Sequence, residues 1–378
     1  MSGPIQLYLV PGFFGFVNFG DLIYFSHVRE FLDAELSTRG RRADIYRCAT
    51  SPTASITTRA SELVRFIAET AEGDGPIAII GHSTGGLDAR LVATPGVALD
   101  GDLDPEPIAA RIESITSIAS PHRGTPMASF FTGLLGQKLL KVLSLLTLEV
   151  LREGPIPVAY LAKLGATLAR MRLPGSKSAK VLDHLYEDLL GRLPGSERDQ
   201  VSSFMATVAL DQALLPQLTP AGLDLFNASA VDRPKVRYGC VVARASRPHF
   251  RNRVALRFDL WKQAAYAFYQ WLHALAGFND NSISWEPSPE QREQLLGAYG
   301  EETRPSDNDG IVPTLSQLHG ELIHATTADH LDVIGHFDDE GHQPPHHDWL
   351  TTCSHFDRGR FESLWTSVAD FISTREES

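Results

Sequence analysis

The sequence predicts an α/β fold in which a mostly parallel central sheet is flanked by helices and carries a helical insertion. Short apolar runs alternate with amphipathic helical periodicity through residues 1–127, with short connections between them. This alternation is typical of parallel strands covered on both faces by helices. Strand character then disappears and returns only after residue 232. We therefore expect a core of residues 1–127 and 233–378, with residues 128–232 inserted as a helical cap or lid.

The individual elements follow from the period of the apolar residues. Short, largely apolar segments predict strands at residues 5–10, 77–80, 115–119, 236–243 and 321–325, and a further short strand is expected at residues 44–47. Apolar residues spaced three and four apart predict helices near residues 28–36, 60–67 and 361–372. Strands and helices thus alternate along the chain in the order that a parallel sheet requires.

Two insertions hold most of the remaining helical signal. In residues 128–232 apolar faces recur near 139–146 and 161–168, which predicts either a lid that controls access to a site or an ordinary helical subdomain. A second helical insertion, at about residues 246–305, contains an aromatic-rich helix with Phe258, Trp261, Tyr266, Phe268, Tyr269, Trp271 and Leu272. Because aromatic side chains at helical spacing usually pack together, we expect this set in the core.

Composition and charge exclude several classes of function. The 378 residues are 43% hydrophobic with a net charge of −12, which argues against nucleic-acid binding and gives no general attraction to anionic membranes. The leucine-rich stretch 130–151 includes Lys138, Lys141 and Glu149, which argues against a transmembrane segment. The three cysteines lie far apart and suggest no disulfide framework. No signal peptide is visible, so we expect a cytoplasmic protein, or a secreted one only if a leader is missing from this sequence.

The most informative motif is Gly-His-Ser-Thr-Gly at residues 81–85. It follows the apolar run at 77–80 and precedes a helical pattern at 86–93. A strand, a Gly-x-Ser-x-Gly turn and a helix in this order form a nucleophile elbow, which exposes a serine hydroxyl at the top of a sheet. The sequence therefore predicts Ser83 as a nucleophile in acyl transfer.

A serine nucleophile needs a histidine base and a carboxylate that orients it. In chains with this elbow the order is serine, acid, histidine. Asp309 lies in a polar turn at residues 306–313, and His330 follows the last expected strand. We predict Asp309 as the acid and His330 as the base. The rival base is His336, and the rival acids are Asp307, Asp329 and Asp332.

The reaction also requires donors for the developing oxyanion. One is the backbone N–H of the residue after the nucleophile, which is Thr84. The other should come from a loop after an early strand, and Val-Pro-Gly-Phe-Phe-Gly at residues 10–15 fits, with the N–H of Phe13 as the donor. The alternative reading of this loop is a turn that only reverses the chain.

Several separated motifs together resemble the bacterial true lipases, a triacylglycerol lipase-like family of the α/β-hydrolase superfamily. They are residues 11–16, 24–36, 81–90, 118–125, 308–312 and 330–332, in the family's order. The resemblance implies an α/β-hydrolase core with the triad Ser83, Asp309 and His330, and an oxyanion hole at Phe13 and Thr84. Pro11 departs from the pattern because it stands where the family has a histidine.

The resemblance also implies a structural calcium ion near the histidine, although the chemistry requires no cofactor. Asp332 matches one ligand position, but His336 stands where the family has a glutamine, and histidine is a poor calcium ligand. A separate candidate, for zinc, is the group His342, His346, His347 and Asp348. The two prolines within that group make a solvated loop the alternative reading.

These features predict a serine carboxylic-ester hydrolase, namely a lipase or long-chain esterase that forms an acyl-enzyme intermediate. The leucine-rich cap favours an apolar acyl chain and a transient contact with a lipid interface. The alternatives are a hydrolase or acyltransferase for another acyl substrate, such as a polyester or phospholipid, and a non-catalytic binding protein with a hydrolase-like fold.

Overall fold

The computed structural model describes residues 3–13, 18–19, 22–170, 178–277, 286–339, 341 and 347–374. Six strands form one sheet in the order β4-β1-β5-β6-β7-β8, and every neighbouring pair is parallel. The strands are β1 (Ile5–Val10), β4 (Ala43–Arg47), β5 (Ile77–His82), β6 (Ile112–Ile118), β7 (Arg237–Ala243) and β8 (Glu321–Thr326). Each overlaps a strand expected from the sequence, so the prediction of a parallel sheet is confirmed.

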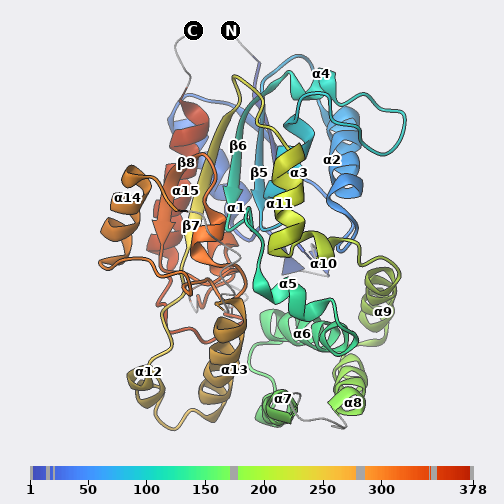
Figure 1. Cartoon of the computed structure of the whole chain (residues 1–378), viewed down its shortest axis with the longest axis vertical. Coiled ribbons are helices and arrows are strands. Elements are labelled where there is room, and N and C mark those ends of the chain that lie inside the picture. The colour runs from blue at the N-terminus through green and yellow to red at the C-terminus, as the bar shows by residue number, and fades with distance from the viewer. Residues whose placement is uncertain are drawn as a thin grey trace.

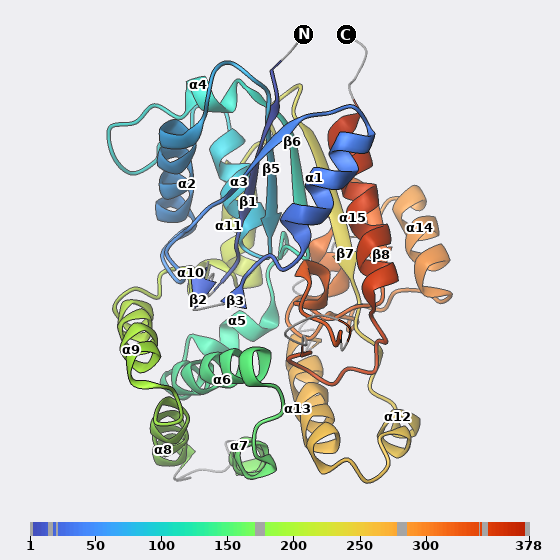
Figure 2. The ribbon, with the colours of Figure 1, turned by 180° about the vertical axis from the view of Figure 1, so that it is seen from behind.

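Helices cover both faces of this sheet because side chains alternate along each strand. In β1, Leu7 and Leu9 pack toward α1 and α15, whereas Tyr8 and Val10 pack toward α2 and α3. Figure 2 shows α1 and α15 side by side over one face. The covering helices are α1 (Val28–Thr38), α2 (Ile56–Thr70), α3 (Gly85–Ala93) and α15 (Arg358–Ser373).

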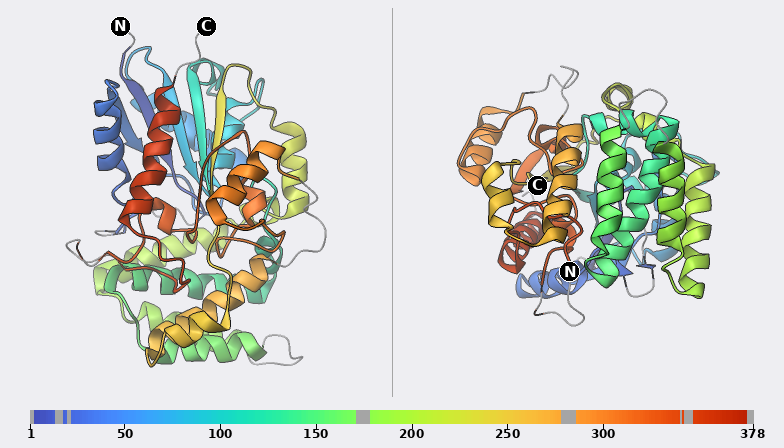
Figure 3. Two further views of the ribbon diagram at one scale, coloured as in Figure 1. Left: turned by 90° about the vertical axis from the view of Figure 1, so that its left-hand side faces the viewer. Right: turned by 90° about the horizontal axis from the view of Figure 1, so that it is seen from below.

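A layer of helices lies across the carboxyl ends of the strands (Figures 1 and 3). It draws on both insertions, because α6, α7, α8 and α13 share one apolar cluster. The helices between β6 and β7 are α5 (Pro126–Phe131), α6 (Leu134–Glu153), α7 (Val158–Arg170), α8 (Ser178–Leu190), α9 (Gly195–Leu210), α10 (Leu214–Gln217) and α11 (Pro220–Ser229). Those after β7 are α12 (Phe250–Ala255), α13 (Leu260–Ala276) and α14 (Pro289–Tyr299).

The ends of the first insertion belong with the sheet. Leu214, Leu218 and Leu223, from α10, its C-terminal end and α11, pack in the same cluster as α2 and α3. Short elements complete the structure: β2 (Asn18–Phe19), β3 (Leu22–Ile23), α4 (Glu106–Ala109) and two 3₁₀ turns, η1 (Thr314–Gln317) and η2 (Asp332–Ile334). Among the described helices, none combines the length and the hydropathy that crossing a bilayer requires.

The aromatic-rich helix is shorter than its sequence pattern indicates. Tyr266, Phe268 and Tyr269 are buried as expected, but Phe258 is 96% exposed, so its assignment to the core is wrong. The physical reason is a helix boundary: the Asp259 carboxylate accepts a hydrogen bond from the backbone N–H of Lys262 at 2.9 Å and caps α13. Phe258 therefore lies before the helix, in the turn that joins α12 to α13.

Candidate active site

Ser83 lies in a sharp turn between β5 and α3. Its φ is 54°, in the left-handed region that a non-glycine residue seldom adopts. The turn closes tightly because a side chain at Gly81 would collide with the backbone of Gly85, and one at Gly85 would collide with the carbonyl of Val10. The Ser83 N–H donates to the carbonyl of Ile118 at 2.8 Å. These contacts hold the serine at the carboxyl end of β5.

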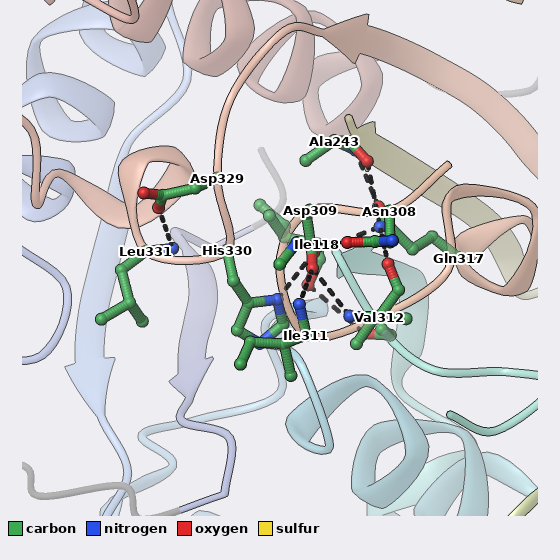
Figure 4. Close-up of polar contacts among 12 residues, drawn as sticks. Ile118, Ala243, Asn308, Asp309, Ile311, Val312, Gln317, Asp329, His330 and Leu331 are labelled. Atoms are coloured by element: carbon green, nitrogen blue, oxygen red, sulfur yellow. Dashed lines mark hydrogen bonds and ion pairs between the residues drawn. The ribbon is translucent and has the colours of Figure 1, made fainter. Parts of the chain in front are cut away.

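His330 and Asp309 meet beside this turn. The Nδ1 of His330 lies 2.7 Å from Oδ2 of Asp309, and the His330 backbone N–H donates to the Asp309 carbonyl at 3.0 Å. Figure 4 shows the imidazole pointing at the carboxylate. Asp309 follows β7 after the second insertion, and His330 follows β8, so both come from the carboxyl edge of the sheet, where ligands bind in open α/β sheets.

The Asp309 carboxylate is buried and held on both oxygens. Oδ1 accepts from the N–H groups of Ile311 and Val312 at 2.9 and 2.7 Å. Oδ2 also accepts from Nε2 of Gln317 at 3.2 Å, and the carbonyl oxygen of this amide accepts from the N–H of Ala243 at 2.7 Å. Gln317 therefore fixes the rotation of the carboxylate. No motif or periodicity marks Gln317 in the sequence, so sequence reasoning missed it.

The rival acids and the rival base have other partners. Asp307 accepts hydrogen bonds from Arg247 at 2.6 Å on each oxygen. Nε2 of His336 lies 2.9 Å from the backbone carbonyl of Tyr24. Asp329 accepts from the indole N–H of Trp349 at 2.9 Å. The geometry thus places Asp309, rather than these carboxylates, at Nδ1 of His330.

A chain of hydrogen bonds links the expected oxyanion loop to His330. Nε2 of His82 lies 2.9 Å from the carbonyl of His330, so this nitrogen carries the proton and donates. Nδ1 must then accept from the hydroxyl of Tyr24 at 2.6 Å, and the tyrosine oxygen accepts from the N–H of Gly12 at 2.9 Å. Burial, together with the charge of nearby His330, holds the pKa of His82 well below its usual range, so its ring stays neutral.

A buried ion pair supports the same loop from the other side. Nη2 of Arg59 donates to the carbonyl of Pro11 at 2.8 Å and to Asp88 at 2.7 Å. Both side chains are fully buried, and burial raises the pKa of Asp88 to about 6 despite the opposing effect of Arg59. Arg59 thus connects the residue before Gly12 to the helix that follows Ser83. Sequence reasoning missed Arg59, because it lies inside an amphipathic helix and belongs to no motif.

Ser83 and His330 face one apolar cavity. Phe13 and Thr84, the expected oxyanion donors, also line this cavity. Its far wall comes from the helical layer and includes Leu140, Leu143, Leu148, Val201, Phe204 and Met205. The cavity therefore joins the polar groups at the sheet edge to a hydrocarbon-lined space beneath α6 and α9.

Three aspartates gather behind the loop of His330. One carboxylate oxygen of each of Asp329, Asp332 and Asp348 lies within 4.8 Å of the others. Burial raises the pKa of Asp329 to about 6, and burial together with repulsion from Asp329 raises the pKa values of Asp332 and Asp348 well above their usual range. Oδ2 of Asp329 is buried, with no hydrogen-bond partner in the described part of the chain. A set of hard carboxylate oxygens with an unpartnered buried member fits calcium.

This cluster revises the expected metal ligands. Asp332, the calcium candidate of the sequence, is one of the three aspartates, whereas His336, bonded to the Tyr24 carbonyl, lies outside the cluster. Asp348 lies with the two other aspartates, which favours calcium over zinc for this residue. His342 and His346, two members of the zinc candidate, lie outside the described residues.

Comparisons with known proteins bear on the fold. No protein-family model and no curated protein matches the sequence. EstA from Clostridium botulinum matches the structure with a TM-score of 0.52 at 16% identity, over 100% of this chain and 89% of EstA. Staphylococcus hyicus lipase matches with a TM-score of 0.52 at 16% identity, over 98% of this chain and 95% of the lipase. The chain therefore has the α/β-hydrolase fold that its motifs indicate.

Proposed function

We propose that the protein is a serine carboxylic-ester hydrolase in which Ser83 is the nucleophile, His330 the base and Asp309 the orienting acid. The observation that carries this proposal is the pairing of His330 with Asp309 at 2.7 Å, beside a left-handed serine that faces the same cavity. A neutral histidine that donates from Nδ1 has Nε2 free to accept the proton of a serine hydroxyl.

The proposed reaction has two stages. The Ser83 oxygen attacks the ester carbonyl while His330 takes its proton, and the tetrahedral oxyanion binds the N–H groups of Thr84 and Phe13. His330 then protonates the departing alcohol, which leaves the acyl group on Ser83. Water attacks this ester with His330 again as base, and the acid is released. Thr84 precedes α3, whose N-terminal dipole adds favourable potential at the oxyanion.

The cavity supports an apolar acyl substrate. Its walls are mainly aliphatic and aromatic, so burial of each methylene contributes about 0.8 kcal/mol to binding. We therefore propose a lipase or long-chain esterase, with the helices of residues 128–232 as a cap over the acyl group. The fold likeness to Staphylococcus hyicus lipase is consistent with this substrate class.

Covalent labelling tests the nucleophile. A fluorophosphonate probe should label the wild-type protein and leave Ser83→Ala unlabelled, while Ser120→Ala, a buried serine near the elbow, serves as the matched control. An unlabelled wild-type protein would indicate a non-catalytic binding protein instead. Turnover of p-nitrophenyl esters of graded length then defines the acyl group, and a preference for acetate over longer chains would refute the long-chain assignment.

We also propose that Asp329, Asp332 and Asp348 hold a structural calcium ion. The ion would supply positive charge to three crowded carboxylates and so stabilise the loop that carries His330. Thermal unfolding with calcium and with a chelator tests this proposal. We expect calcium to raise Tm in the wild type and in Asp183→Asn, an exposed control, but not in Asp348→Asn. An equal response in all three proteins would refute the site.

A further inference from the structure

A cluster of large apolar side chains is exposed at one end of the helical layer. Phe250 and Val254 on α12 are 76% and 59% exposed, and Phe258 and Leu260 beyond it are 96% and 69% exposed. We call residues 250–262 the α12 tip. Figure 1 shows α12 at the end of the molecule opposite the two termini. Four such side chains within eleven residues exceed the scattered exposure that is ordinary on a protein surface.

Hydrogen bonds hold the backbone of the tip. The His249 side chain accepts from the N–H of Arg251 at 3.1 Å and caps α12. The hydroxyl of Tyr266 contacts both the N–H and the carbonyl of His249, at 2.8 and 3.1 Å. Arg257 turns the chain with a φ of 50°, and Asp259 caps α13. The fold thus presents Phe258 on a capped turn between two helices.

The tip is also strongly cationic, unlike the rest of the chain. Arg251, Arg253, Arg257 and Lys262 are exposed, and the single carboxylate among them, Asp259, is the helix cap. Within the described ranges these four cations form no ion pair, so no carboxylate neutralises them. The protein as a whole has a net charge of −12, so the charge of the tip is opposite in sign to that of the whole protein.

The exposed apolar surface continues from the tip toward the active-site cavity. Leu260, Ala264, Ala267 and Trp271 lie on one face of α13 by their helical spacing. The last three line an apolar groove against α7, where exposed Ala162, Gly165, Ala166 and Ala169 complete it. Leu272, one residue further along α13, lines the cavity of Ser83. With a rise of 1.5 Å per residue, the tip and the cavity wall are about 18 Å apart along this helix.

We propose that the α12 tip docks the protein on an anionic lipid surface. Phe250, Phe258 and Leu260 enter the boundary between headgroups and acyl chains, while the arginines and Lys262 bind lipid phosphates. A convex tip of aromatic and cationic side chains suits insertion into a soft interface. At physiological salt the charges of the distant acidic surface are screened within about 8 Å, so the local cations determine the attraction.

Docking at the α12 tip does not require Ser83 chemistry, but the benefit that we assign to docking rests on the proposed esterase function. Docking would hold the cavity near a membrane or lipid droplet that supplies an ester. The α12 tip belongs to the second insertion, so the proposed lipid contact lies outside residues 128–232. The inactive Ser83→Ala protein should dock as well as the wild type, so a failed hydrolase assay and a failed docking assay are distinguishable.

Co-sedimentation with vesicles tests docking directly. Ser83→Ala protein should bind vesicles of phosphatidylglycerol and phosphatidylcholine, and bind pure phosphatidylcholine vesicles much more weakly. In that background, Phe258→Ser should weaken binding about tenfold, the effect of about 1.4 kcal/mol of lost burial. Arg253→Gln should weaken it about fivefold on the anionic vesicles only.

Matched substitutions provide the control. Leu225→Ser, at a side chain 77% exposed on α11, and Arg292→Gln, at an exposed arginine on α14, should leave binding unchanged. Equal binding to both kinds of vesicle, or equal effects of tip and control substitutions, would overturn the proposal. A wild-type dimer in analytical ultracentrifugation that Phe258→Ser dissociates, without vesicle binding, would instead identify the occupant of the tip as a second copy of this chain.

Discussion

Replacing Tyr24 by phenylalanine tests whether the hydrogen-bond chain from Gly12 to His330 positions the proposed oxyanion loop. The change removes one hydroxyl that both accepts from the Gly12 N–H at 2.9 Å and donates to Nδ1 of His82 at 2.6 Å. The Gly12 N–H and Nδ1 of His82 then lose this hydrogen-bond partner in a buried site, where each unsatisfied group costs about 1–3 kcal/mol. For the two groups together we expect the free energy of unfolding to fall by about 2–6 kcal/mol.

Activity should fall along with stability. Removing an oxyanion donor typically lowers kcat by 10²–10³. Tyr24→Phe keeps the donor and removes only a hydrogen bond that supports its loop, so we expect kcat to fall about tenfold. KM should change little, because the Tyr24 hydroxyl forms its hydrogen bonds with Gly12 and His82 rather than with the substrate. Urea unfolding followed by tryptophan fluorescence, and turnover of a p-nitrophenyl ester, measure the two effects.

A second buried tyrosine supplies the control. The Tyr8 hydroxyl lies 3.3 Å from the hydroxyl of Thr70 on α2, and its ring packs on the sheet face covered by α2 and α3. Tyr8→Phe should cost about 1 kcal/mol or less and leave kcat intact. If Tyr24→Phe lowers stability but keeps the wild-type kcat, the hydrogen-bond chain stabilises the fold without positioning the loop, and our reasoning is wrong.

Three further substitutions test other parts of the site and core. Asp309→Asn should lower kcat by about 10⁴ with little change in Tm, because an amide NH₂ facing Nδ1 of His330 favours the wrong tautomer; a loss below tenfold in steady-state turnover would contradict this role. Arg59→Met should cost about 3–5 kcal/mol in urea unfolding because it leaves Asp88 buried without its cation, and an unchanged midpoint would contradict it. Burial, with His319 and two arginines nearby, holds the pKa of His122 well below its usual range. The unfolded state therefore binds the proton first, and stability should fall as pH drops below about 6.5; His122→Gln should flatten this fall in urea midpoints, and equal slopes would argue against it.

Much of the framework was accessible from the sequence. The interior strands β1, β5 and β7 coincide with largely apolar runs because they are buried on both faces of the sheet. The edge strands β4 and β8 are partly exposed and carry charged residues. The elbow at residues 81–85 was readable because only small residues allow β5 and α3 to approach so closely. The positions of Asp309 and His330 after later strands were predictable from chain order, since parallel strands deliver their carboxyl ends to one edge.

Other features depend on residues that are distant along the chain. Gln317, in a short 3₁₀ turn, and Arg59, in an amphipathic helix, resemble ordinary polar residues in the sequence. Only the folded structure brings them to the Asp309 carboxylate and the Pro11 carbonyl. Likewise, Asp348 joins Asp329 across a loop that the sequence pattern leaves undefined.

The contrast is clearest between Ser83 and Phe258. The sequence by itself determined the strained turn at Ser83, because its sterics depend on residues within a few positions along the chain. Whether an aromatic side chain is buried depends on what packs against it from elsewhere, and this cannot be read from its spacing alone. Tertiary structure therefore decided that Tyr269 lies in the core and that Phe258 faces solvent.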